Sequence, residues 1–293
     1  MSHAHTERLV STVTEDGLVL EGAQFTPTQD TPGGTVVVWM HGFTGRFYEA
    51  HTVAIGRGLA DRGYTFITGN NRGHDLGAFI QRQDRSPGLM AGAWWEDIGE
   101  CKFDLAAWIG FGCQAGASRV VLAGHSLGAM KAVWYMGTCQ DDRVSGLISA
   151  SGPLRIWQRM GAAPERLATA RALVAEGRGG ELLPPDAGGR ITSAATLVYR
   201  ADLDTDVYGF QQPGAEAPLC NIRCPILFVL GSEEPEIGRK EDLPTLKSNA
   251  RAAASTETVY VDGADHVYHD REHVVVDAIA NWLPIVAAVP ADR

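Results

Sequence analysis

The sequence has no long apolar run. A helix needs about 18 consecutive apolar residues to cross a bilayer, and no uninterrupted apolar run among the 293 residues approaches that length. The first ten residues also lack the apolar core of a secretory signal. These two absences predict a soluble, cytoplasmic protein with no membrane insertion.

Basic residues are in the minority. The chain contains 25 Lys and Arg against 35 Asp and Glu, which gives a net charge of −10. A surface of this sign repels nucleic acid and anionic lipid. We therefore expect a small-molecule substrate and no nucleic acid as partner. No surface pattern indicates the oligomeric state.

Cysteine is scarce, with five residues spread over the chain. An odd number without a secretory signal predicts free thiols. The closest pair, Cys220 and Cys224, has neither a second pair nor a histidine nearby, which argues against the usual zinc motifs. We expect no metal and no cofactor.

Glycine, by contrast, is plentiful, and two of the 34 glycines frame a serine. Residues 124–128 read Gly-His-Ser-Leu-Gly, between a β-branched run and a stretch rich in Ala, Met and Leu. A strand that turns sharply into a helix strains the bend residue and needs small neighbours two positions away. The pattern predicts that Ser126 is a nucleophile at such a bend, beside a helix N-terminus.

Apolar patterning predicts strands and helices that alternate. A hairpin precedes several fully apolar runs, which are typical of parallel strands covered on both faces. The expected strands are residues 9–14, 18–26, 35–40, 64–68, 119–123, 144–150, 225–231 and 258–261. The expected helices are residues 48–62, 93–111, 127–140, 243–254 and 271–282. This order predicts an α/β protein with a doubly wound, mostly parallel eight-stranded sheet.

The alternation stops over residues 153–219. This segment has helical patterns at 156–160 and 165–176 and a Gly/Pro-rich break at 177–189. A segment of this length between sheet strands is typical of a lid. We therefore expect residues 1–152 and 220–293 to form the core, with a helical lid inserted after the sixth strand.

A serine nucleophile requires a base and an acid to orient that base, in the chain order serine, acid, histidine. His266 follows the last strand and suits the base. Glu234 is the preferred acid in the turn 231–236. Glu233 and Glu236 in that turn, and the acidic run Asp202, Asp204 and Asp206, are the alternatives.

An acyl-transfer site also needs donors for the oxyanion. The N–H of Leu127 at the bend and the N–H of Phe43 after the third strand are the predicted pair. His41 is expected to brace the Phe43 loop, and His125 and His74 to be structural.

Aromatic and methionine side chains in and near the lid predict an apolar substrate pocket. The candidates are Trp94, Trp95, Met130, Trp157, Met160 and Tyr208, with Tyr199 and Phe210 beside them.

His41-Gly42-Phe43, residues 124–128, residues 231–235 and Asp265-His266 resemble the motif series of the α/β-hydrolase fold, over nearly the whole chain. The loop 70–75, Asn-Asn-Arg-Gly-His-Asp, is similar more narrowly to siderophore-esterase-like hydrolases. The wider resemblance implies a triad of Ser126, His266 and an acid, with Phe43 and Leu127 in the oxyanion hole. A glutamate where aspartate is usual, and the lack of proline after Phe43, depart from the common pattern.

These residues predict a serine hydrolase that cleaves an ester or thioester of a small, partly hydrophobic substrate through an acyl-enzyme. Lactone, amide and C–C bond cleavage use the same residues and stay open. The alternative from another functional class is a ligand-binding protein that has the hydrolase fold but does not turn over a substrate.

Overall fold

Eight strands form one central sheet in the computed structural model, which describes residues 5–29, 34–155, 163–186, 189–203, 206–211 and 216–288. The strands are β1 (His5–Val13), β2 (Val19–Pro27), β3 (Thr35–Met40), β4 (Thr65–Gly69), β7 (Arg119–His125), β8 (Val144–Ala150), β11 (Ile226–Gly231) and β12 (Thr256–Val261). Their order is β1-β2-β4-β3-β7-β8-β11-β12. Pairing is antiparallel from β1 to β4 and parallel from β4 to β12. The predicted mostly parallel eight-stranded sheet is confirmed.

The central strands are apolar because both of their faces are covered. Every residue of β3, β4 and β11 is buried, and so is all of β7 after Arg119. Met40 pairs with Gly124, and His125 pairs with Ala150. This register brings the carboxyl ends of β3, β7 and β8 to one edge of the sheet.

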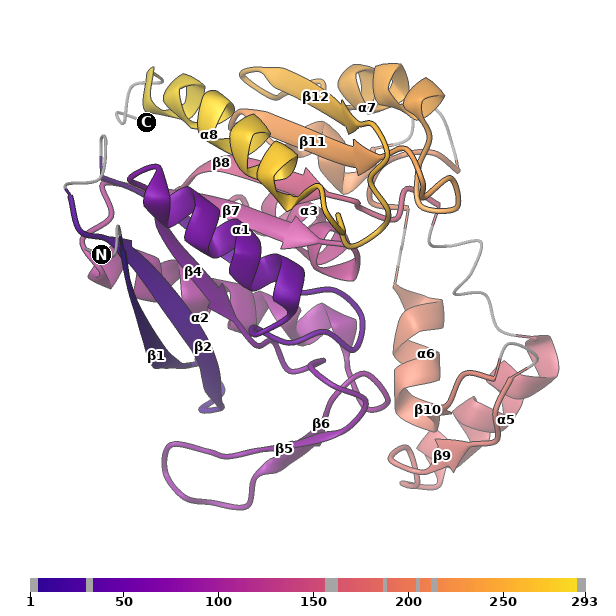
Figure 1. Cartoon of the computed structure of the whole chain (residues 1–293). Helices are drawn as coiled ribbons and strands as arrows, with labels where there is room; N and C mark the ends of the chain where they lie inside the picture. The colour runs from indigo at the N-terminus through magenta and orange to yellow at the C-terminus, as the bar shows by residue number, and fades with distance from the viewer. Residues whose placement is uncertain are drawn as a thin grey trace.

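Helices cover both faces of the sheet (Figure 1). On one face α1 (Ala50–Asp61) packs beside α8 (Glu272–Ala288). On the other lie α2 (Cys101–Gln114), α3 (Leu127–Cys139) and α7 (Leu243–Asn249), whose buried side chains share one core cluster. The arrangement is the predicted doubly wound one. None of the helices among the described residues has the length and apolar character needed to cross a membrane.

Three predicted helices have clearly different bounds in the structure, and one of them, 271–282, continues to Ala288. The expected helix 93–111 begins only after the short turn η2 (Ile98–Glu100), because the Asp97 side chain accepts a 2.8 Å hydrogen bond from Gly99 N and caps that turn. The expected helix 243–254 ends at Asn249. A small hairpin of β5 (Ala78–Ile80) and β6 (Leu89–Ala91) was not predicted.

The segment between β8 and β11 has a small core of its own in its middle part, whereas Val207, Tyr208 and Leu219 join the larger core cluster. It contains α5 (Pro164–Ala175), β9 (Leu182–Leu183), β10 (Thr192–Ser193), α6 (Ala194–Asp202) and η3 (Pro218–Asn221), and η4 (Lys240–Asp242) follows β11. A cluster of four buried side chains forms a core of its own: Ala170, Leu183, Ala194 and Leu197. The expected helix 156–160 lies outside the described residues. In Figure 1 this inserted segment lies on the side toward which β7 and β11 point.

Three consecutive residues of the main body hold the inserted segment. Arg200 Nη2 donates to Ala93 O at 2.9 Å, and Ser193 N donates to Trp94 O at 2.7 Å. Trp95 Nε1 donates to Gly180 O at 2.8 Å. The segment is therefore docked on the loop that follows β6.

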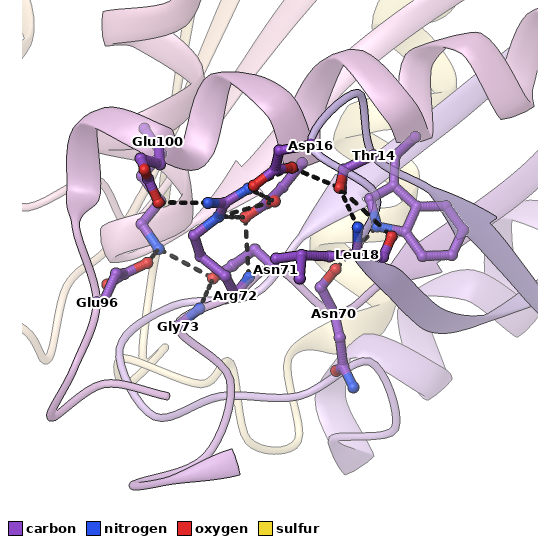
Figure 2. Close-up of polar contacts among 12 residues, drawn as sticks. Thr14, Asp16, Leu18, Asn70, Asn71, Arg72, Gly73, Glu96 and Glu100 are labelled. Atoms are coloured by element: carbon purple, nitrogen blue, oxygen red, sulfur yellow. Dashed lines mark hydrogen bonds and ion pairs between the residues drawn. The ribbon is translucent and has the colours of Figure 1, made fainter. Parts of the chain in front are cut away.

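A buried ion cluster fixes the loop after β4. Arg72, only 2% exposed, contacts the fully buried carboxylate of Asp104 through Nη2 at 2.9 Å. Nη1 donates to Glu100 at 2.5 Å, and Nη2 also donates to Asp16 at 3.2 Å. Figure 2 shows the guanidinium between the carboxylates of Glu100 and Asp16. One side chain thus ties the loop to α2 and to the β1–β2 turn.

Replacing Arg72 by methionine leaves these carboxylates without their counter-charge. Because breaking a buried ion pair from one side costs about 3–5 kcal/mol, we expect Arg72→Met to lower the free energy of unfolding by that amount. Arg57→Met is the control, since Arg57 pairs with Glu7 at the surface and such a pair contributes about 0–1 kcal/mol. Urea unfolding followed by circular dichroism measures both, and equal losses would contradict the expectation.

Candidate active site

Ser126 lies at a strained bend between β7 and α3. Its backbone has φ 54° and ψ −124°, a conformation that is rare for residues other than glycine. A Cβ on Gly124 would lie 2.3 Å from Gly128 O, and a Cβ on Gly128 would lie 2.4 Å from His41 O. Both distances are shorter than van der Waals contact, so the bend requires glycine at these two positions.

The structure brings Ser126, His266 and Glu234 into one chain of hydrogen bonds. His266 Nε2 lies 2.9 Å from Ser126 Oγ, and His266 Nδ1 lies 2.6 Å from Glu234 Oε2. The carboxylate can only accept, so Nδ1 carries the proton and Nε2 is left to accept from the serine hydroxyl. His266 is half-buried, whereas Glu234 is fully buried.

Glu234 is also fixed by two further donors. Ser151 Oγ and Gly231 N donate to its Oε1 at 2.5 Å and 2.6 Å. Its neighbours Glu233 and Glu236 are exposed. Of the three carboxylates in this turn, the structure therefore places Glu234 against the imidazole.

The acidic run of the inserted segment is engaged elsewhere. Asp202 accepts a 2.6 Å hydrogen bond from Arg171 at the surface. Asp206 accepts from the backbone N–H groups of Phe210 and Gln211 at 2.8 Å and 2.6 Å. Asp204 lies outside the described residues.

Two residues beside the acid were missed by the sequence analysis. Ser151 follows β8 with φ 45°, and its Oγ lies 2.6 Å from the hydroxyl of the fully buried Tyr268. Because a hydroxyl has one proton, Ser151 donates it to Glu234 and accepts from Tyr268. The sequence signal that could have indicated Ser151 is its position directly after β8, the strand next to β7.

Three imidazoles lie side by side near the serine. His125 lies with its ring centroid 4.9 Å from the rings of both His51 and His266. Burial lowers the pKa of His125 well below its usual value and that of His51 to about 4, so both are neutral near pH 7. His125 Nε2 donates to His266 O at 2.6 Å, which fixes the backbone of His266. His125 is thus structural, as expected.

A hollow of about 450 Å³ has Tyr48, His51 and Val267 among its lining residues. Of the three imidazoles, His51 lines it.

The loop after β3 lies directly over the bend. A Cβ on Gly42 would be 2.8 Å from Ser126 Cβ, so the backbone on either side of Gly42 faces the serine. Leu127 is the first residue of α3, and its N–H therefore has no acceptor within the helix. Phe43, the other predicted donor, follows Gly42 in this loop and its side chain is partly exposed.

His41 braces this loop. Its Nδ1 lies 2.9 Å from Gly42 O, and its Nε2 accepts from Asn71 N at 3.1 Å. Burial lowers the pKa of His41 to about 3, which keeps the ring neutral and able to accept.

A buried ion pair connects the helix after Ser126 to the same region. Lys131 Nζ donates to Glu96 Oε1 and, at 3.0 Å, to Asn71 Oδ1. Both charged side chains are at most 2% exposed. Asn71 thereby joins α3, the loop after β4 and, through His41, the loop that faces Ser126. The narrower sequence resemblance rests on the loop 70–75, and in this structure that loop holds the loop after β3 and α3 together through Asn71.

The predicted pocket residues lie in different places. Met130 and Tyr208 are buried in the larger core cluster, and Tyr208 bonds to Ser149 Oγ at 3.0 Å, so their assignment to a pocket is corrected: both belong to the core. Trp94 and Trp95 are half-buried at the docking loop of the inserted segment. Trp157 and Met160 lie outside the described residues.

The other two histidines that follow β12, His269 and His273, are exposed. All five cysteines are free thiols. Within the described ranges, no group of three or more His, Cys, Asp or Glu side chains is arranged to hold a metal ion.

Comparison with known proteins decides the family. A model of the alpha/beta hydrolase family matches residues 37–278. The chain belongs to the alpha/beta hydrolase family. No match was found among curated protein sequences.

Solved structures share the fold of this hydrolase. Est1E from Butyrivibrio proteoclasticus, with ferulic acid bound, superposes with a TM-score of 0.68 at 17% identity, over 96% of this chain and 100% of that one. The Pyrococcus furiosus esterase Pf2001 gives 0.61 at 15% identity, over 96% and 93%. The alpha/beta hydrolase GrgF from Penicillium sp. sh18 gives 0.66 at 16% identity, over 96% and 98%.

Adding one methyl group at the bend tests its geometry. In Gly128→Ala the new Cβ pushes against His41 O, which displaces the serine or the loop above it. Since a displacement of about 1 Å costs about 100-fold in rate, labelling of Ser126 by a fluorophosphonate is expected to slow by at least that factor.

Gly180→Ala is the matched control, because its Cβ would meet nothing within 4 Å. Circular dichroism establishes that both variants are folded. Unchanged labelling of folded Gly128→Ala would show that the close approach is unimportant for the reactive serine.

Proposed function

We propose that this protein is a serine hydrolase that cleaves an ester or thioester of a small, partly hydrophobic substrate through an acyl-enzyme. The observation that carries the proposal is the hydrogen-bond chain from Ser126 through His266 to the buried Glu234. This chain combines a nucleophile, a general base and an orienting acid at a strained strand-to-helix bend.

In the first half-reaction Ser126 Oγ attacks the acyl carbonyl while His266 Nε2 takes its proton. Glu234 holds the Nδ1–H and stabilises the imidazolium that forms. The N–H groups of Leu127 and Phe43 bind the oxyanion. His266 then gives its proton to the departing alcohol or thiol, and the acyl group stays on Ser126.

The second half-reaction repeats these steps with water. His266 takes a proton from a water molecule, whose oxygen attacks the acyl carbonyl. The tetrahedral adduct collapses, the acid leaves, and Ser126 regains its proton from the imidazolium. The neutral, buried His125 keeps the base in place through the backbone of His266 in both steps.

The inserted segment, residues 153–219, is proposed to act as a lid that selects the substrate. It docks at Trp94 and Trp95, which are the pocket candidates that lie between the main body and the segment. The ferulic acid bound to Est1E, a small aromatic acid, supports an acyl part of this size and character for the present substrate.

Ester hydrolysis is tested with p-nitrophenyl esters of increasing acyl length, together with a thioester, an amide and a lactone. Because Ser126 forms the acyl-enzyme, we expect Ser126→Ala to lose at least about 10⁴-fold in kcat and all fluorophosphonate labelling. Turnover by Ser126→Ala equal to that of the parent protein would favour a binding protein without catalysis.

The identity of the acid is tested by three substitutions in one turn. Glu234→Gln removes the charge opposite the imidazolium, so we expect kcat to fall about 10³- to 10⁴-fold. Glu233→Gln and Glu236→Gln are the matched controls and are expected to stay within about twofold, since both side chains are exposed. Equal small losses in all three variants would point to an acid outside this turn.

A further inference from the structure

Arg200 brings a positive charge from the inserted segment to the loop that faces Ser126. It lies in the last turns of α6, and its Cζ lies 5.5 Å from the ring centroid of Phe43. Phe43 follows Gly42, whose backbone touches Ser126. An acyl group that extends from Ser126 along this loop therefore approaches the guanidinium.

One donor of this guanidinium is unused. Nη2 donates to Ala93 O, whereas the buried Nε has no hydrogen-bond partner among the described residues. Burial lowers the pKa of Arg200, yet an arginine side chain stays protonated near neutral pH. A buried charged donor without a partner is unfavourable, and a bound acceptor would remove that cost.

The carboxylate that acts on Arg200 also pairs with a lysine. The charge of Glu96 acts on Arg200, but its Oε1 is bonded to Lys131. Its buried Oε2 has no partner within the described ranges, so no hydrogen bond joins it to Arg200. The carboxylate whose charge acts on Arg200 is thus shared with Lys131, and Arg190 adds a second cation that acts on Arg200.

We propose that Arg200 determines specificity by binding a carboxylate on the acyl part of the substrate. The preferred substrate is then a monoester or monothioester of a dicarboxylic acid. A carboxylate suits the site because guanidinium N–H groups form strong charge-assisted bonds to it. The inference rests on the proposed function, since the acyl carbon at Ser126 fixes where the second carboxylate lies.

The test compares two esters that differ only at the end of the acyl chain. These are p-nitrophenyl hydrogen adipate, with a free carboxylate, and p-nitrophenyl hexanoate, with a methyl group. For Arg200→Met we expect kcat/KM for the adipate to fall about 10- to 100-fold more than for the hexanoate, the range of a hydrogen bond to a charged group. Arg200→Lys is expected to restore part of the preference.

Arg178→Met is the matched control on the same segment, because Arg178 pairs with Glu176 and Glu181 at the surface. We expect it to leave the ratio of the two kcat/KM values unchanged. If Arg200 only clamps the segment through Ala93 and Phe43, Arg200→Met lowers both values equally. An unchanged ratio, with or without a loss of activity, overturns the inference.

A binding measurement separates this inference from the proposed function. Calorimetry with adipate monoamide in the Ser126→Ala background requires no turnover, and Arg200→Met is expected to weaken binding at least 10-fold there. Equal binding with and without Arg200 overturns the inference. Absence of hydrolysis of both esters by the parent protein overturns the proposed function instead, while the calorimetry still decides on Arg200.

Discussion

The bend at Ser126 is the constraint on which the site depends. Its positive φ turns the first residues of α3 back against β7, so both positions two residues away must be glycine. Because Gly128 also packs directly under the carbonyl of His41, the same contact fixes the loop after β3 over the serine. The close packing of β7, the start of α3 and the loop after β3 therefore positions the proposed nucleophile and the proposed oxyanion-hole loop together.

A buried polar network holds this arrangement from behind. Asn71 contacts His41 and Lys131, and the adjacent Arg72 ties the loop to α2 and to the β1–β2 turn. Such a network is costly unless its charges are paired, and Lys131 and Arg72 each have carboxylate partners. The network therefore specifies one position for the loop, which a purely apolar contact would leave less well defined.

The pattern of apolar residues was enough to predict the sheet, because parallel strands that are covered on both faces consist of continuous apolar runs. The bend at Ser126 was predictable because its geometry requires glycine two positions away on either side. Glu234 was the preferred acid from the sequence, but the sequence Gly-Ser-Glu-Glu-Pro-Glu does not reveal that Glu234 is buried while Glu233 and Glu236 are exposed, so these two stayed as alternatives. Ser151 and Tyr268 were out of reach for the same reason, since their role arises from strands that are distant in the chain. The start of α2 was misjudged because the local Asp97 cap overrides a continuous helical pattern.

The proposed chemistry and the proposed substrate recognition lie in different parts of this hydrolase. The chain of Ser126, His266 and Glu234 is built from the edge of the sheet and is held by the main body alone. The inserted segment has its own small core, and three hydrogen bonds dock it on residues 93–95, two through its backbone and one through the side chain of Arg200. Arg200 takes part in both the docking and the proposed recognition, because its side chain docks the segment on Ala93 and lies over Phe43 in the loop that faces Ser126. A change at Arg200 therefore acts on the position of the segment as well as on the charge beside the proposed site, whereas Ser126, His266 and Glu234 keep their own hydrogen bonds.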